Sequence, residues 1–255
     1  MKTTLQRLFL SAVYGLLYLP ILILVIYSVN DAKYSLIWHG FSLRWYAELF
    51  ADHSLWLAFF NSVILGLCSA LVATTFGLLT SVNLFLFKNA NQRFLYGLLL
   101  LLIVIPDLVL GVALLIFFNY AHVSLGFFSL LIAHVTFSLP FVILTINSRI
   151  KTLNPNIYFG ALDLGASRYI ALTRIMLPLL WPAVFSAFLL SFTLSFDDVI
   201  ISYFVAGPEY TILPLTIYSL VRAGVTPELN ALCTITLALS MILVVIAHRL
   251  SRRTW

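Results

Sequence analysis

Asp197 and Asp198 stand side by side in the stretch TLSFDDVIISYFV, residues 193–205, which is otherwise mostly apolar. A charged side chain near the centre of a bilayer costs about 2.5–3.5 kcal/mol on insertion scales, and adjacent carboxylates also repel each other. Such acids usually face a bundle interior or a wet cavity, where they mark the path of an ion or substrate. Asp107 lies in a second apolar stretch, IVIPDLVLGVALL. These residue types indicate an acidic station for a cation.

Neighbouring residues on a helix point about 100° apart, so we expect one carboxylate to face a cavity and the other a neighbouring helix or subunit. The apolar stretches that carry these three acids contain no Lys or Arg. Compensation of the negative charge is therefore expected from a proton, a partner subunit or a cationic substrate. Tyr203 can offer a ring face to an alkylammonium group; Phe196, Phe204 and Tyr210 are further candidates, although plain packing is the commoner role of each.

The composition places the chain in a membrane. Of 255 residues, 62% are hydrophobic and 9% charged, with a mean hydropathy of +1.08, whereas soluble domains carry roughly 25% charged residues. The net charge of +5 is spread over short loops, so nucleic acid is not an expected partner. Cys68 and Cys233 both lie in apolar segments and do not suggest a disulfide framework.

A transmembrane helix needs about 20 mostly apolar residues. The sequence predicts an all-α integral membrane protein, with a single domain over residues 1–255 and six transmembrane helices at about 8–29, 57–85, 94–120, 127–147, 180–205 and 231–250. With a rise of about 1.5 Å per residue along unbroken outward spans, Asp107 lies about 20 Å and Asp197 about 24 Å from the cytoplasmic end. The acids are therefore expected at one depth, in the outer half of the membrane.

The distribution of Lys and Arg sets the orientation. With a cytoplasmic N-terminus, 11 of the 14 basic residues fall on the cytoplasmic side and 3, namely Lys33, Arg44 and Arg222, on the other. This split follows the positive-inside rule. Both termini and the 148–178 connection are therefore predicted to be cytoplasmic.

Residues 148–178 read as two short helices around a glycine. Asn154 can cap the first helix, with Pro155 at its first position. Gly165 can end that helix in a left-handed conformation. Ser167 can cap the second helix, which runs toward Met176, and Pro178 then stands ahead of the next span.

This loop resembles a cytoplasmic pattern in the permease subunits of binding-protein-dependent ABC importers: E-A-A, three residues, G, nine residues, I-x-L-P. Gly165 is followed at the right distance by Ile175, Leu177 and Pro178, while Phe159, Gly160 and Ala161 replace Glu-Ala-Ala. The resemblance implies a type I importer permease fold in which this coupling loop docks on a cytoplasmic ATPase. The expected coupling residues are Phe159, Gly160, Ala161, Asp163, Gly165, Ala166, Ser167, Ile175, Leu177 and Pro178. The missing Glu puts one polar contact in doubt.

The run LSFDDVIISYFVAGPEYTILPLTIYSLVRAGVTPELNAL, with IPDLVLGVALL upstream, is similar to PotC-type permeases of spermidine/putrescine importers. This resemblance implies a bacterial inner-membrane subunit that moves polyamines to the cytoplasm, along a path that includes Asp107, Asp197, Asp198 and Tyr203. It also implies a second permease subunit, two ATPase subunits that hold ATP and Mg, and a periplasmic substrate-binding protein. No cofactor or metal is expected in this chain.

Three other functions stay open. Relatives of this family carry other small organic solutes. A membrane enzyme would use His122, His134 and the aspartates, but the histidines are twelve residues apart across a turn, which suits no common metal site; His134 is more often a hydrogen-bonded packing residue. A cation channel with an acidic ring would not need the glycine-centred loop. Since no G-x-x-x-x-G-K-[ST] loop occurs, ATP hydrolysis is assigned to a partner.

Overall fold

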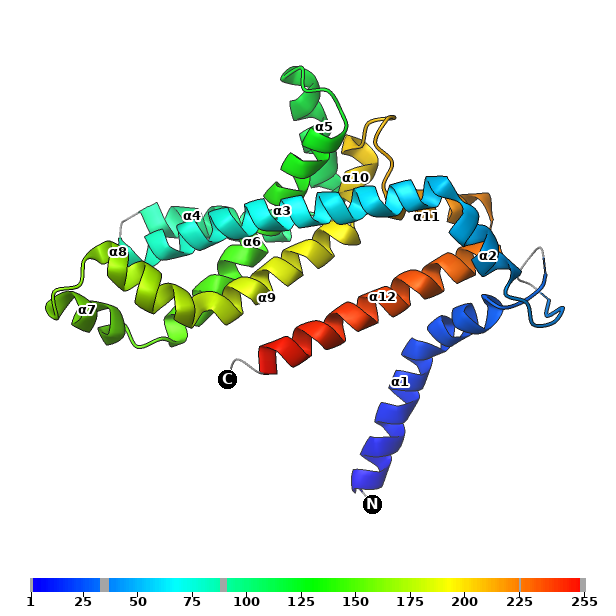
Figure 1. Ribbon diagram of the computed structural model, residues 1–255, viewed down its shortest axis with the longest axis horizontal. Helices are drawn as coiled ribbons and strands as arrows, with labels where there is room; N and C mark the ends of the chain where they lie inside the picture. Colours follow the sequence, from blue (N-terminus) through cyan, green and yellow to red (C-terminus); the bar gives the residue numbers. More distant parts are fainter. Residues whose placement is uncertain (1, 33–36, 88–90, 225, 253–255) are drawn as a thin grey trace. The chain divides into compact units, whose positions relative to one another are not determined.

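The protein is built from helices, as its composition predicts. The structure, a computed structural model, describes residues 2–32, 37–87, 91–224 and 226–252 (Figure 1). Within these residues the only β-type pairing is an isolated bridge between Asn30 and Phe41. The chain divides into two compact units, one of residues 1–58 and 216–250 and the other of residues 59–215 and 251–255. They are described separately, and the assignment of residues 1–255 to one domain stays a prediction.

The first unit contains α1 (Lys2–Tyr27), α2 (Arg44–Ala51), the start of α3 (His53–Leu86), most of α11 (Leu213–Ala223) and α12 (Pro227–Arg252). Asn30 organises the connection after α1. Its side-chain amide donates to the Ile37 carbonyl at 2.8 Å and accepts from the His39 N–H at 2.8 Å. The Trp45 indole donates to the Asn30 carbonyl at 2.9 Å, which ties the connection to α2.

The second unit contains the rest of α3, followed by the helices that carry the candidate site. They are α4 (Asn91–Val104), α5 (Asp107–Tyr120), α6 (Phe127–Thr152), α7 (Asn156–Asp163), α8 (Arg168–Ile170), η1 (Ala171–Met176), α9 (Leu177–Phe196) and α10 (Ile200–Val205). The central pair is α6 and α9, while α10 packs on α5 and α6 (Figure 1). One apolar core joins α3, α6 and α9, and a second joins α5, α6 and α10.

Four helices in the described residues are long and apolar enough to cross a membrane: Leu5–Tyr27, His53–Leu86, Phe127–Thr152 and Arg168–Phe196. The pair α4 and α5 adds a fifth candidate if it is one broken span. The apolar part of α12 is shorter, Pro227–Ile242. Six spans therefore remain a prediction.

The third predicted span, 94–120, is not continuous. It divides into α4 and α5, which meet at an angle of 107°. The division falls at Pro106, which has no N–H to donate and disfavours a helical conformation in the residue before it. The depth calculated for Asp107 along a straight span is therefore wrong.

The fifth predicted span, 180–205, differs at both of its ends. One helical run extends from Arg168 to Phe196, with a π-helical turn over Ala171–Met176, and α10 follows after a break at Asp197–Val199. Pro178 lies inside this run and not ahead of it. Proline has no N–H to donate to the helix, and a local π-helical turn compensates for the missing hydrogen bond. The depth calculated for Asp197 started from Trp181, so it does not hold either.

Candidate functional site

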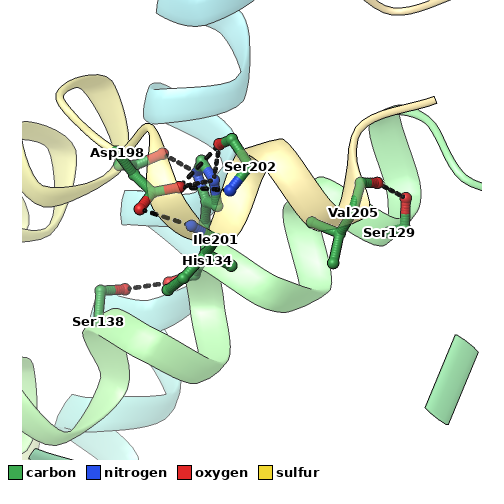
Figure 2. A network of polar contacts seen from close by, with 8 residues as sticks. Ser129, His134, Ser138, Asp198, Ile201, Ser202 and Val205 are labelled. Carbon is green, nitrogen blue, oxygen red and sulfur yellow. Dashed lines mark hydrogen bonds and ion pairs between the residues drawn. The ribbon is translucent and has the colours of Figure 1, made fainter. Parts of the chain in front are cut away.

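Asp198 caps α10 at the break between α9 and α10. Its carboxylate accepts hydrogen bonds from the N–H of Ile201 at 3.3 Å and the N–H of Ser202 at 2.7 Å, and from the Ser202 hydroxyl at 2.8 Å (Figure 2). The residue is 8% exposed. The first turn of a helix has unpaired N–H groups and a positive dipole end, so it stabilises a buried carboxylate. The expectation that all charge compensation comes from outside the chain is therefore wrong for Asp198.

His134 on α6 connects this cap to α9. Its ring is fully buried, with Nδ1 at 2.6 Å from the Ser195 hydroxyl, and Nε2 at 3.0 Å from the Ser202 hydroxyl and 3.5 Å from the Asp198 carboxylate. Since the Ser202 hydroxyl donates to Asp198, it accepts from Nε2–H of His134. Both ring nitrogens of the buried imidazole therefore have hydrogen-bond partners within the chain. His134 is thus a hydrogen-bonded packing residue, as its apolar helix suggests.

Asp197 differs from its neighbour. It ends α9, where its N–H donates to the Thr193 carbonyl at 3.0 Å, and its side chain is exposed. The carboxylate makes no hydrogen bond or ion pair within the described residues. The structure therefore separates the acids: Asp198 is bound to its own chain, and Asp197 is available to another molecule.

Asp107 begins α5 and is partly buried. Helix α5 packs closely on α10, because Gly111 leaves room for the backbone of Ile201; a β-carbon at Gly111 would lie 3.3 Å from the Ile201 Cα. This contact brings the first turn of α5 toward the first turn of α10, and Asp107 and Asp198 lie within electrostatic range of each other. Packing of two short helices, and not a shared depth on straight spans, brings these acids together.

The aromatic residues near the break divide into packed and exposed groups. The ring of Phe196 stacks on Phe192 at 5.7 Å, and Phe204 packs on Gly111. The Tyr210 hydroxyl donates to the Asn61 carbonyl at 3.1 Å, and its ring contacts Phe127. Tyr203 is 56% exposed on α10. Of the four aromatics considered from sequence, Tyr203 is the one that offers an exposed ring.

The two histidines of the enzyme alternative lie in different parts of the second unit. No group of three or more His, Cys, Asp and Glu residues in the described part of the chain is arranged to hold a metal ion. His122 is exposed at the turn after α5, while His134 is buried between α6, α9 and α10. The two histidines of the enzyme alternative therefore have different surroundings and different partners.

The loop after α6 has the helix-ending glycine and the Ser167 cap that its sequence predicts, but α7 begins at Asn156 with Pro155 as its N-cap, one residue later than expected, and the second part of the loop continues into α9. The Asn154 side chain accepts from the N–H of Asn156 at 3.0 Å, at the start of α7. Gly165 has a φ of +89°; its N–H donates to the Leu162 carbonyl at 2.9 Å, and the Ala166 N–H to the Ala161 carbonyl at 3.0 Å. These bonds form a Schellman motif, which ends a helix through a left-handed glycine.

The second part of the loop begins at Ser167, whose hydroxyl accepts from the N–H of Ile170 at 3.3 Å. The two parts pack together through a small core of Tyr158, Ala171 and Met176, which also contacts the end of α3. The Tyr158 ring meets Phe85 at 5.7 Å between centroids. The loop is therefore a folded unit held on the helix bundle.

Three large apolar or aromatic side chains of this loop are exposed. Leu164 is 91% exposed, Tyr169 75% and Phe159 54%. Exposed apolar surface commonly marks a place that another protein covers. Leu164 and Tyr169 were not among the coupling residues expected from sequence, although Leu164 directly precedes Gly165 and Tyr169 lies two residues after Ser167.

The remaining expected loop residues lie on the same folded unit. Asp163, Gly165, Ser167 and Pro178 are exposed, and five others are partly buried: Gly160, Ala161, Ala166, Ile175 and Leu177. The structure thus places these residues on or beside one folded loop. Their contact with an ATPase stays a prediction.

Comparison with known proteins agrees with this geometry. Residues 73–254 match the family described as binding-protein-dependent transport system inner membrane component. The spermidine/putrescine transport system permease protein PotC of Haemophilus influenzae is 46% identical over 98% of this chain and 97% of its own. PotC of Escherichia coli strain K12 is 44% identical over 96% of this chain and 92% of its own. The putrescine transport system permease protein PotI of that strain is 39% identical over 87% and 81%.

Solved structures show the same fold. A chain of a bacterial alginate ABC transporter, in complex with a periplasmic protein bound to an alginate pentasaccharide, superposes with a TM-score of 0.76 at 16% identity. The match covers 98% of this chain and 94% of that one. A chain of the MetNI methionine ABC transporter in an inward-facing conformation gives 0.62 at 13% identity, over 80% and 99%. The chain therefore belongs to the family of binding-protein-dependent transport system inner membrane components, the permeases of ABC importers.

Proposed function

We propose that this chain is the permease subunit that moves polyamines such as spermidine and putrescine inward through an ATP-driven importer. The exposed carboxylate of Asp197, which has no partner within the described residues and directly precedes the buried Asp198, carries this proposal. A polyamine is a flexible polycation and needs carboxylates along its path. The similarity to PotC and PotI over most of the chain supports the same substrate class.

In this proposal the three acids have different parts. Asp197 contacts the ammonium groups of the passing substrate, and the exposed Tyr203 ring of α10 offers them a cation–π contact. Asp198 fixes the start of α10 through its hydrogen bonds and contributes its charge from behind. Asp107 adds negative charge at the start of α5. Attraction at such a station has to be moderate, because a site that binds too tightly does not release its cargo.

The 148–178 loop carries the proposed coupling to ATP hydrolysis. In this proposal the exposed side chains of Phe159, Leu164 and Tyr169 dock on a cytoplasmic ATPase subunit that holds ATP and Mg. The assembled importer then contains a second homologous permease, two ATPase subunits and a periplasmic binding protein. It lies in the bacterial inner membrane with both termini of this chain cytoplasmic.

The direct test uses the assembled importer in proteoliposomes. We expect its ATPase rate, in the presence of the binding protein, to rise with spermidine or putrescine and not with neutral solutes of similar size. Radiolabelled polyamine should accumulate on the side opposite the binding protein, where the ATPase subunits lie, and only with ATP. Stimulation by a neutral sugar or a zwitterionic amino acid, and none by any amine, would assign the chain to another small organic solute.

A further inference from the structure

A cavity of about 790 Å³ lies where the end of α3, the start of α4 and the end of α6 meet. One wall is apolar and includes Leu84, Phe85 and Ile150, while the other carries the cations Arg93 and Lys151 with the polar groups of Tyr96 and Asn147. No Asp or Glu is among the described residues that line it. The cavity is therefore amphipathic and positively charged.

Both cations are available to a ligand. Arg93 and Lys151 are exposed, and neither forms an ion pair with a carboxylate among the described residues. The Lys151 ammonium lies 5.4 Å from the centre of the Tyr96 ring, a cation–π contact that holds it at the cavity. The Asn147 amide donates to the Tyr96 hydroxyl at 2.9 Å, which fixes that ring in turn. Two positive charges are thus positioned without a counter-charge.

The backbone favours an anion at the same place. Helix α4 begins at Asn91, so Arg93 lies in its first turn, where N–H groups without helical partners and the positive end of the dipole attract negative groups. A small free anion, however, has no hydrocarbon that could contact the apolar wall. An amphiphile with a phosphate next to hydrocarbon fits both walls, and basic pockets between transmembrane helices are known to hold such headgroups.

We propose that this cavity binds the phosphate headgroup of an anionic phospholipid, with Arg93 and Lys151 on the phosphate and the glycerol and upper acyl region against the apolar wall. The site is separate from the substrate path and does not depend on which solute is carried. Phe85 also contacts Tyr158 of α7, so a bound lipid supports the helix on which the coupling loop rests.

The test uses the assembled importer in a neutral detergent. Apparent affinity is measured from thermal unfolding midpoints during titration with dihexanoylphosphatidylglycerol, dihexanoylphosphatidylcholine or inorganic phosphate. Phosphatidylglycerol should raise the midpoint at concentrations at least tenfold lower than phosphatidylcholine. In the Arg93→Gln/Lys151→Gln double variant this preference should disappear, since a charge-assisted contact is worth on the order of a tenfold change in affinity for each cation. Arg7→Gln, which removes an exposed cation of α1, should keep the preference.

Each other outcome rejects the proposal. Equal effects of the two lipids, or a preference that survives the double variant, would show that the cavity is not an anionic lipid site. Inorganic phosphate acting as strongly as phosphatidylglycerol would assign it to a free anion. If phosphatidylglycerol is preferred only after the ATPase subunits are removed, the cavity belongs to the interface between this chain and the ATPase. The two single variants, each expected to lose part of the preference, guard against an unfolded double variant.

Discussion

The two neighbouring aspartates illustrate how a shift of one residue along the chain decides the role of a carboxylate. Asp198 is buried, yet three hydrogen-bond donors and the start of α10 compensate its charge. Asp197, one residue earlier, ends α9 and has no such partners within the described residues. A buried acceptor that loses its donors costs about 1–3 kcal/mol. Replacing each acid by Asn should therefore have different consequences.

Asp198→Asn should destabilise the chain, because an amide group presents its own N–H to at least one donor that the carboxylate accepts from. We expect a lower thermal unfolding midpoint and reduced recovery of the importer. Asp197→Asn should leave both unchanged, while polyamine uptake falls at least tenfold, since a charged contact is roughly twice as strong as a neutral one. Uptake, recovery and unfolding midpoint are measured on the same preparations. Normal uptake by Asp197→Asn would remove it from the substrate path.

Part of this site is visible in the sequence and part is not. The unusual position of the acids in an apolar run is visible, and Ser202 stands one turn after Asp198, as a capping partner does. His134 is 64 positions upstream of Asp198, so only the packing of α6 against α9 and α10 reveals its contact. The separation of Asp197 from Asp198 also depends on the break in the helix, which β-branched Val199 and Ile200 do not signal.

Among the elements, the broken helices are the least predictable. A hydropathy sum treats residues 94–120 as one span because it measures apolar length and not direction. Pro106 followed by Asp107 is a good start for a new helix, since proline at a first turn loses no hydrogen bond and an acid there is stabilised by the dipole. The local capping signals of the 148–178 loop, by contrast, are short-range and predict its helices well.

The Schellman motif at Gly165 leads to a prediction about α7, the helix that it ends. A β-carbon at this position would meet no atom within 4 Å, so the effect of substitution comes from its φ of +89°. A non-glycine residue in a left-handed conformation costs about 1–2 kcal/mol, and more for a β-branched one. Gly165→Val should therefore displace the end of α7, weaken copurification of the ATPase and abolish ATP-driven uptake, with membrane insertion unchanged.

Gly97→Ala provides the matched control for this loop. Gly97 lies within α4, and a β-carbon there also meets nothing within 4 Å. Alanine in a helix interior is more favourable than glycine by roughly 0.5–1 kcal/mol, so copurification and uptake should match the wild type. If Gly165→Val binds the ATPase and transports as Gly97→Ala does, the loop has no coupling role.

At the scale of the whole molecule, much of the surface is suited to a bilayer or to partners. The apolar window of α1 within Leu5–Tyr27 has none of its residues buried inside this chain. Such a helix needs lipid or another membrane subunit around it. In the proposed assembly, the second permease is one candidate for this neighbour.

Orientation in the membrane is the last prediction, and the second unit shows how to test it. The loops after α5 and after α10 lie at one end of this unit, because Gly207 packs against the backbone of Leu125 and Gly126. The α6–α7 connection and Ser167 belong to the folded loop at the other end, near the end of α3. Basic residues concentrate at this second end, with Arg93, Arg149, Lys151, Arg168 and Arg174. The positive-inside rule then makes that end cytoplasmic.

Single cysteines report the two ends independently. In a background where Cys68 and Cys233 are replaced by Ser, Ser124→Cys and Glu209→Cys should react with a membrane-impermeant maleimide added to spheroplasts. Thr152→Cys and Ser167→Cys should react only after the membrane is permeabilised. All four side chains are exposed in the structure, and reaction after permeabilisation shows that a site protected in intact spheroplasts was shielded by the membrane and not by another subunit. Labelling of Thr152→Cys and Ser167→Cys in intact spheroplasts, with the other two protected, would reverse the orientation and place the coupling loop beyond the reach of a cytoplasmic ATPase.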